Sequence, residues 1–224
     1  MKKKLFIIPM MIAVLGGCSI NVGITDESHD KGTSHKEISF EYFEGDTIDE
    51  SLYTKAVINM PKYKTPADFH GHKETVDGQE VMVTPATEVV NYLGEQPDIL
   101  ESVINPQDVG NTELGLKIGN LITYINGGIT FSFKKNIAAV RISAQPRSAI
   151  SYEMDQVKEE IDQETAISVN GSKYIMLNSD FDSIENIVDT ECNYVLPEAS
   201  KTVTLAVGKF RAIISSITVY TLNS

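Results

Sequence analysis

From residue 38 onward, hydrophobic and polar residues alternate in short runs. Ile38, Phe40 and Tyr42 are separated by single polar residues, and this period of two is typical of a β-strand with one buried face. Beyond Gly110 similar runs recur at short intervals, with turn residues between them. Many short strands at this spacing predict a mainly β chain folded as an antiparallel β-sandwich. The runs lie at residues 114–118, 121–125, 128–133, 137–144, 166–170, 173–177, 193–196, 201–207 and 211–222.

Two Asn-Gly pairs mark turns between these runs. Asn170-Gly171 separates the apolar residues at 167–169 from those at 174–176, which is the arrangement of a β-hairpin. Asn126-Gly127 marks a second turn, and both pairs are expected to adopt positive φ. Gly119 is expected in a turn as well.

The same alternation assigns the faces of the strands. Val140 and Ile142 are expected to point into the core, with Arg141 and Ser143 on the opposite face. In the last run, strict alternation would place the odd-numbered residues from 213 to 221 on one face and the even-numbered residues on the other.

We expect one or two short helices among the strands. Thr84 begins and Gly94 ends an apolar run that fits a short helix, although its Thr and Val content is equally typical of a strand. The run 98–104 has apolar residues three and four positions apart and stops before Pro106, which predicts a second helical turn. The charged segment 154–164 interrupts the β pattern and is interpreted as an acidic loop or one solvated helix.

The first residues have the layout of a secretory signal. Lysines at residues 2–4 precede an apolar run at 5–15, and this run is shorter than the roughly 20 residues of a membrane-spanning helix. It ends in Leu15-Gly16-Gly17-Cys18, which resembles the lipobox of bacterial lipoproteins. The resemblance implies cleavage before Cys18 and acylation of that cysteine, which would anchor the chain to a membrane. The alternative is an ordinary secreted protein with Cys18 near the cleavage site by chance.

These observations divide the chain into four parts. Residues 1–17 are a signal peptide, and residues 18–37 are a polar, lipidated and flexible tether without regular periodicity. Residues 38–109 are a β-rich extension that is either separate or part of the same sandwich, which residues 110–224 form. We therefore expect an extracytoplasmic protein, lipid-anchored to a bacterial membrane at the cell surface or the periplasmic face.

The charge balance narrows the range of partners. The chain has 19 Lys and Arg against 31 Asp and Glu, a formal net charge of −12. Loss of the three leader lysines would take this to −15. Such a chain is repelled by phosphate backbones, so we expect no nucleic-acid partner.

Cysteine usage excludes an intramolecular disulfide framework. The chain has two cysteines, and lipidation would leave Cys192 without a partner. We interpret Cys192 as a small buried side chain in a strand, with a reactive thiol or an intermolecular bridge as the alternatives.

The C-terminal half, roughly residues 110–224, resembles the galactose-binding-like jelly roll, a β-sandwich that many carbohydrate-binding modules and discoidin-type domains share. The resemblance implies a jelly-roll-like sandwich and carbohydrate binding, but its matching positions are strands and turns that packing alone explains. The segments that carry it are Leu116-Lys117-Ile118-Gly119-Asn120, Gly128-Ile129-Thr130-Phe131-Ser132-Phe133, Val140-Arg141-Ile142-Ser143-Ala144, Ile167-Ser168-Val169-Asn170-Gly171 and Ile217-Thr218-Val219-Tyr220.

Candidate sugar-binding residues follow from the chemistry of pyranose rings. The apolar face of a sugar stacks on an aromatic ring while its hydroxyls bind polar groups. Trp is absent, so Tyr124, Tyr152 and Tyr174 are the candidate platforms, with Arg141 and Arg147 as donors. Tyr in a strand is more often a half-buried packing residue.

Two candidate metal sites are visible in the N-terminal half. Asp46, Asp49 and Glu50 form an acidic cluster, and hard oxygen ligands suit a structural calcium ion, although a chain this acidic forms such clusters by accident. His70 and His72 flank a glycine in a loop, which is a poor frame for a zinc site. No other cofactor is expected.

The sequence contains no Gly-x-Ser-x-Gly elbow, phosphate-binding loop or His-Glu-x-x-His motif. We therefore expect a surface lipoprotein that is not an enzyme and that binds an extracellular glycan or a protein partner. The alternatives are a small glycan hydrolase with paired carboxylates, typically about 5–10 Å apart, and a structural component of a surface assembly.

Overall fold

A computed structural model of the chain describes residues 40–60, 62, 72–76, 79–83, 93, 99–119, 127–153, 156–161 and 164–223. Residues 1–37, which were predicted to be a signal peptide and a tether and which include Cys18, lie outside the described part. The described part is mainly β, which confirms the predicted fold class. None of its helical segments has the length and apolar character needed to cross a membrane.

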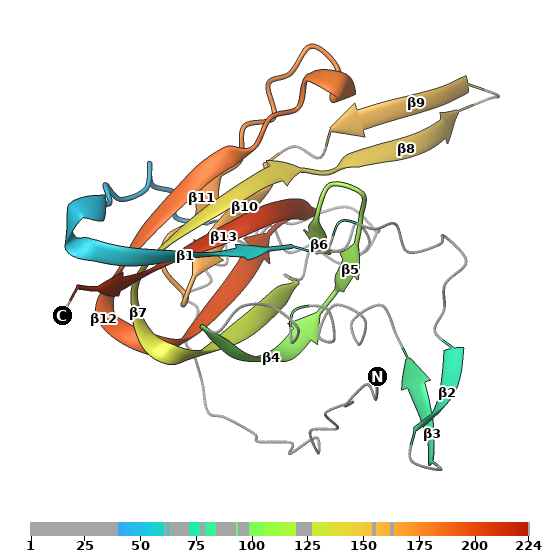
Figure 1. The fold of residues 1–224 in the computed structure, drawn as a ribbon. Coiled ribbons are helices and arrows are strands. Elements are labelled where there is room, and N and C mark those ends of the chain that lie inside the picture. Colours follow the sequence, from blue (N-terminus) through green and yellow to red (C-terminus); the bar gives the residue numbers. More distant parts are fainter. Residues whose placement is uncertain are drawn as a thin grey trace, which may run out of the picture.

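Nine strands form one antiparallel sheet in the order β11-β10-β12-β7-β13-β6-β5, with β1 paired to β13 and β4 paired to β7 (Figure 1). Two further hairpins, β2–β3 and β8–β9, are separate. The strands are β1 (Tyr53–Asn59), β2 (His72–Val76), β3 (Gln79–Val83), β4 (Leu100–Gln107), β5 (Val109–Asn111), β6 (Leu116–Ile118), β7 (Gly128–Pro146), β8 (Ser148–Glu153), β9 (Gln156–Ile161), β10 (Ala166–Val169), β11 (Ile175–Met176), β12 (Thr190–Gly208) and β13 (Ala212–Leu222). Two 3-10 helices accompany them, η1 (Glu50–Leu52) and η2 (Ile184–Asn186).

Two long bent strands, β7 and β12, fold the sheet over itself. The first part of β7 pairs with the end of β12 and with β4, whereas its second part pairs with the start of β12 and with β13. The β7–β12 register slips between Val195 and Thr202, and Figure 1 shows both strands curving together at this point. Each long strand therefore belongs to both layers of the sandwich.

The core lies between the two layers. Phe131 and Phe133 from the first part of β7 and Val140 and Ile142 from the second part are fully buried in one cluster. Arg141 is only half-buried. The predicted faces of this strand are confirmed.

β13 departs from the predicted alternation. Ala212 and Ile214 are buried in the core, and so are Ile217 and Val219, because the register with β7 shifts between Ile214 and Ser216. A bulge places one extra residue in the strand and exchanges the two faces. The prediction of one uniform alternation through 211–222 was wrong.

Two segments that were given a helical interpretation are strands. Residues 100–107 form β4, and residues 156–161 form β9. Hydrogen bonding to β7 and β8 decides the conformation, since tertiary pairing outweighs a weak local helical preference. The helix predicted at 84–94 lies outside the described residues apart from Leu93, which is buried.

The predicted Asn170-Gly171 hairpin is confirmed. Both residues have positive φ, 50° and 70°, and Ser172 N donates to Val169 O across 2.9 Å, as in a type I′ turn, and β10 and β11 pair on either side of it. Gly127 does not have the positive φ that was expected of it. Glycine is required there for another reason, because a Cβ would lie 2.6 Å from the backbone nitrogen of Gly119.

Cys192 is a free cysteine, fully buried in β12, as the sequence predicted. Burial, with a smaller contribution from the charge of Glu191, raises the pKa of its thiol to about 12. The thiol therefore stays protonated at neutral pH and packs as a small apolar side chain.

Candidate functional site

The structure separates the predicted sugar-binding residues. Tyr174 belongs to a group of aromatic rings beside β11, and Arg141 belongs to a charged group beside η1. Arg147 follows β7, where its N–H donates to the carbonyl of Arg211. Tyr152 lies in β8, but its side chain is outside the described part, and Tyr124 lies wholly outside it.

Tyr174 packs against two aromatic residues from the start of the described chain. The ring centroids of Phe40 and Tyr174 are 4.5 Å apart, and those of Phe40 and Tyr42 are 6.4 Å apart. Two backbone hydrogen bonds hold this contact, from Tyr174 N to Glu41 O and from Phe43 N to Tyr174 O. We call Phe40, Tyr42 and Tyr174 the aromatic patch.

Gly208 of β12 forms the floor of the aromatic patch. A Cβ built on Gly208 would lie 2.9 Å from Tyr174 Cε1 and 3.0 Å from Phe40 Cζ. Both distances are shorter than normal carbon contacts, so the rings lie against the backbone of β12 only because this residue has no side chain.

One ion pair borders the patch. Lys209 pairs with Glu164, and both charges act on the hydroxyl of Tyr42. Lys173 Nζ also lies 2.6 Å from Glu41 Oε1, on residues next to Tyr174 and Tyr42 in the chain. Tyr42 is 40% exposed, and the pKa of its hydroxyl is raised, chiefly because partial burial disfavours the phenolate. The result is an exposed aromatic face with charged groups at its edges, which is the chemistry needed to stack the apolar face of a sugar and bind its hydroxyls.

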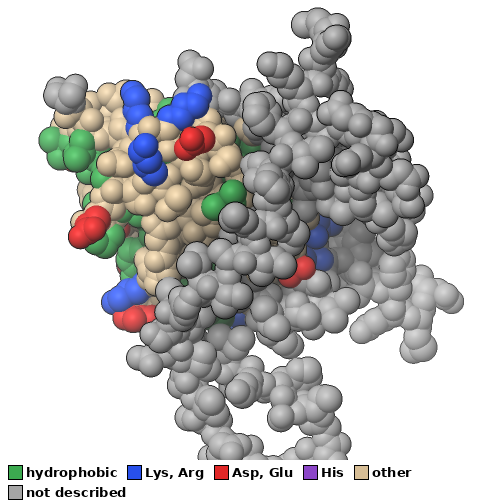
Figure 2. Space-filling model, turned by 90° about the horizontal axis from the view of Figure 1, so that it is seen from below, with side chains coloured by type: hydrophobic (Ala, Val, Ile, Leu, Met, Phe, Trp, Pro, Cys, Tyr) green, Lys and Arg blue, Asp and Glu red, His purple; other side chains and the backbone are tan. Residues whose placement is uncertain are grey.

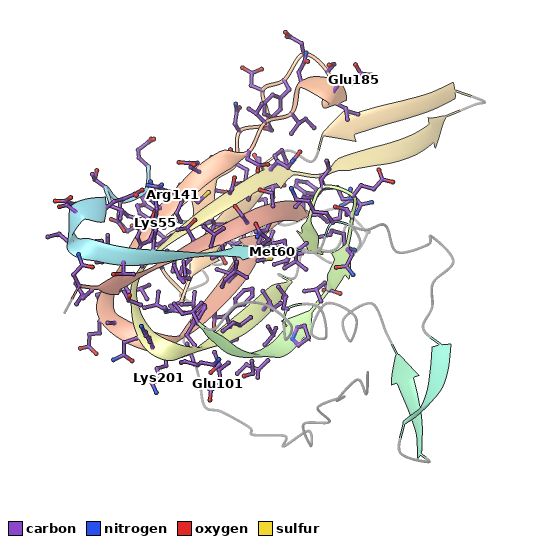
Figure 3. The ribbon with its side chains drawn as sticks, in the orientation of Figure 1. Lys55, Met60, Glu101, Arg141, Glu185 and Lys201 are labelled. Atoms are coloured by element: carbon purple, nitrogen blue, oxygen red, sulfur yellow. The ribbon has the colours of Figure 1, made fainter. Side chains whose placement is uncertain are left out.

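The guanidinium of Arg141 is bound by other side chains of the protein and is not a free donor. Its Nη1 donates to Glu50 Oε1 and its Nε to Asn193 Oδ1, across 2.8 and 2.9 Å. The guanidinium also lies 5.8 Å from the ring centroid of Tyr220. Figure 3 shows Arg141 beside Lys55, whose ammonium donates to Glu50 Oε2 across 2.8 Å.

Glu50 therefore stays ionised. Hydrogen bonds from Lys55, Arg141 and Tyr220, in decreasing order of effect, lower the pKa of Glu50 to about 2. A second carboxylate, Glu191, lies 3.7 Å from Arg141 Nε. Two carboxylates thus share one guanidinium, and Glu50 holds no proton at neutral pH that it could donate as a general acid.

Each member of the predicted calcium cluster has protein partners. Asp46 Oδ2 accepts the N–H of Val195 at 2.7 Å, and Asp49 Oδ1 caps η1 by accepting from Ser51 N at 3.1 Å. Within the described ranges, no three His, Cys, Asp or Glu side chains are grouped so that they could hold a metal ion. Calcium at this loop stays a prediction. The imidazoles of His70 and His72 lie outside the described part.

Phe40, Tyr42 and Gly208 were not predicted as candidate site residues. The alternation at 38–42 did mark Phe40 and Tyr42 as members of one face, but nothing local shows that Gly208 lies beneath them. Comparison of this chain with family models, with curated proteins and with solved structures finds no match.

Proposed function

We propose that this chain is a lipid-anchored extracytoplasmic protein that binds a glycan at the aromatic patch and does not transform it. The observation that carries the proposal is the exposed ring of Tyr42 beside Phe40 and Tyr174, bordered by the Lys209–Glu164 ion pair. A pyranose would stack its C–H face on the rings, and the charged groups would accept and donate hydrogen bonds to its hydroxyls.

The position of the rings favours binding. Tyr174 is held by backbone hydrogen bonds to the segment that carries Phe40 and Tyr42, and Gly208 fixes how deeply the rings lie. A platform that is ordered before the ligand arrives loses little conformational entropy on binding.

The lipobox-like sequence Leu15-Gly16-Gly17-Cys18 supports the anchor and the compartment in this proposal. A lipidated cysteine ahead of the mostly polar segment 19–37 would hold the sandwich near a membrane while leaving the aromatic patch accessible to surface glycans.

Paired-carboxylate hydrolysis has less support. That reaction needs one carboxyl group that is protonated near neutral pH, whereas Glu50 and Glu191 both contact the guanidinium of Arg141 and the pKa of Glu50 is lowered to about 2. We therefore do not propose a catalytic role for this pair.

A glycan array probed with the full chain, followed by calorimetry on the glycans that bind, tests the proposal. Tyr42→Ala is expected to weaken binding about tenfold, because it removes the stacking ring, whereas Tyr42→Phe is expected to keep most of the affinity. Leu114→Ala, which truncates another exposed apolar residue, at the opposite edge of the sheet, is the control. An array without a glycan that binds, or equal affinity of Tyr42→Ala and the unchanged chain, would overturn the proposal.

A further inference from the structure

The sandwich has a hollow at the end where β7 and β12 bend. Its volume is about 710 Å³, and it shares no residue with the aromatic patch. Five of its seven described lining residues carry a hydroxyl, amide or ammonium group, and none of these seven is acidic. They are Thr54, Lys135, Asn136, Ala199, Thr221, Leu222 and Asn223.

The bend itself creates one wall of the hollow. Lys134, Lys135 and Asn136 are three consecutive exposed residues in β7, between the alternating burial of 128–133 and the buried residues 137–140. The partner strand loses its regular register from Val195 to Ser200 at the same point. Because the two strands separate there, the side chains of Lys135 and Asn136 border open space instead of a neighbouring strand.

Hydrogen bonds fix the opposite wall. Thr54 Oγ1 donates to Asn223 Oδ1 at 2.8 Å, and Asn223 Nδ2 donates to Ser51 O at 3.1 Å. Thr221 Oγ1 donates to Thr54 O at 3.3 Å. The polar groups at the ends of β1 and β13 are thus held in place.

The β7 wall of the hollow carries two donor groups, the Lys135 ammonium and the Asn136 amide. Neither the Lys135 ammonium nor the Asn136 amide forms a hydrogen bond or an ion pair with another residue in the part of the chain that the structure describes. Lys201, on β12 opposite the bend, is also exposed and without an ion pair among those residues. Figure 2 shows Lys or Arg side chains on the face of the molecule seen from below, with acidic side chains among them, and Figure 3 places Lys201 and Glu101 on that side.

We propose that this hollow binds the carboxylate of an acidic saccharide. The Lys135 ammonium would form a charge-assisted hydrogen bond to the carboxylate, while the Asn136 amide and the oxygen of Thr221 would bind ring hydroxyls. The chain carries a net charge of −12, which repels anions in general. A hollow whose described lining has no Asp or Glu side chain, and whose lysine has no ion pair among the described residues, is a place where an anion can be accepted.

Calorimetry of the full chain with tri-galacturonate, with a neutral trisaccharide of galactose and with inorganic phosphate tests this inference. We expect binding of tri-galacturonate, no measurable binding of the neutral compound, and weaker binding when sodium chloride is raised from about 50 to about 500 mM. Lys135→Gln is expected to lower the affinity at least about tenfold.

Lys134→Gln is the matched control, because it removes the same charge from the neighbouring exposed lysine, which does not line the hollow. It is expected to change the affinity by less than about twofold. Tyr42→Ala is expected to leave tri-galacturonate binding unchanged, so failure of this site and failure of the aromatic patch can be distinguished. Absence of tri-galacturonate binding, equal binding of the neutral trisaccharide, phosphate binding as tight as that of the saccharide, or equal losses in the two lysine variants would overturn the inference.

Discussion

Glu50 in η1 and Arg141 in β7 form an ion pair of 2.8 Å that fastens the segment before β1 to the centre of the sheet. Lys55 binds the other oxygen of the same carboxylate, also at 2.8 Å. Both bonds need the ionised carboxylate. The stability of the fold should therefore depend on the protonation of Glu50.

We predict that Glu50→Gln destabilises the chain at neutral pH and that the difference disappears in acid. The pKa of Glu50 is lowered from 4.5 to about 2 in the folded state. Its stabilising effect is accordingly present in full above about pH 4.5 and is lost as the pH falls through about 2. Urea titrations of both proteins at about pH 7, 4 and 2.5 measure this difference.

Glu185→Gln is the control for the Glu50 variant. Glu185 is exposed in η2, distant from Lys55 and Arg141 in Figure 3, and has no ion pair among the described residues. Its replacement should change the unfolding free energy little at any of these pH values. A pH-independent difference for Glu50→Gln would show that the carboxylate charge is not what stabilises η1.

The ion pair between Glu50 and Arg141 also shows why the sequence predicted the face of Arg141 but not its partners. Alternation placed Arg141 correctly on the face opposite Val140 and Ile142, but a period of two assigns a face and not a partner. Glu50 and Asn193 approach Arg141 only after distant strands have paired. Long-range contacts of this kind leave no local signal.

The sequence predicts where strand residues lie, but it does not show where one strand ends and the next begins. Residues 128–133 and 137–144 both show clear alternation, yet they belong to the single strand β7. The polar residues 134–136 between them resemble a loop in the sequence, whereas they form the bend that carries β7 from one layer to the other. The bulge in β13 was missed for a related reason, since one inserted residue leaves the composition of the strand unchanged.

The core assignment yields a prediction about Ile142. This residue is fully buried between the layers, so Ile142→Ala should lower the unfolding free energy by about 2–5 kcal/mol through lost burial and a residual cavity. Thr218→Ala, at a half-buried position paired with Arg141, should change it by about 0.5 kcal/mol or less. Denaturant titrations of both variants decide the matter, and equal losses would contradict the assigned faces.

Cys192 should be unreactive in the folded protein. Burial raises the pKa of its thiol to about 12, and only the thiolate attacks a disulfide reagent. In a Cys18→Ala chain, we expect a disulfide-exchange reagent at about pH 8 to label Cys192 only after denaturant is added. Rapid labelling without denaturant would show that β12 opens readily or that the thiol is accessible.

The proposed anchor predicts the distribution of the chain between membrane and soluble fractions. Cys18→Ala should release the protein from membranes, because the acyl chains would be lost and the remaining chain is strongly acidic. Fractionation of cells that express either form measures this. If the variant stays in the pellet after washing with high salt and carbonate, another segment must hold it there. Ser19→Ala, which leaves the cysteine in place, is the control.

Gly208 connects the fold to the aromatic patch. We predict that Gly208→Ala displaces the rings of Phe40 and Tyr174, since the added methyl carbon would lie within 3.0 Å of both. Overpacking of this kind costs about 1–3 kcal/mol, and the near-ultraviolet circular dichroism of the tyrosines should change.

Gly208 does not have a positive φ, so alanine fits the backbone and only the ring contact is disturbed. Gly110→Ala is the matched control, because the atom nearest to its added methyl carbon would be Lys117 Cε at 3.6 Å, an ordinary contact. If glycan binding requires the arrangement of the rings, Gly208→Ala should weaken it to a similar degree as Tyr42→Ala while Gly110→Ala leaves it unchanged. Full binding by Gly208→Ala, together with an altered tyrosine spectrum, would mean that the rings move without consequence for the ligand, and the aromatic patch would lose its place as the binding site.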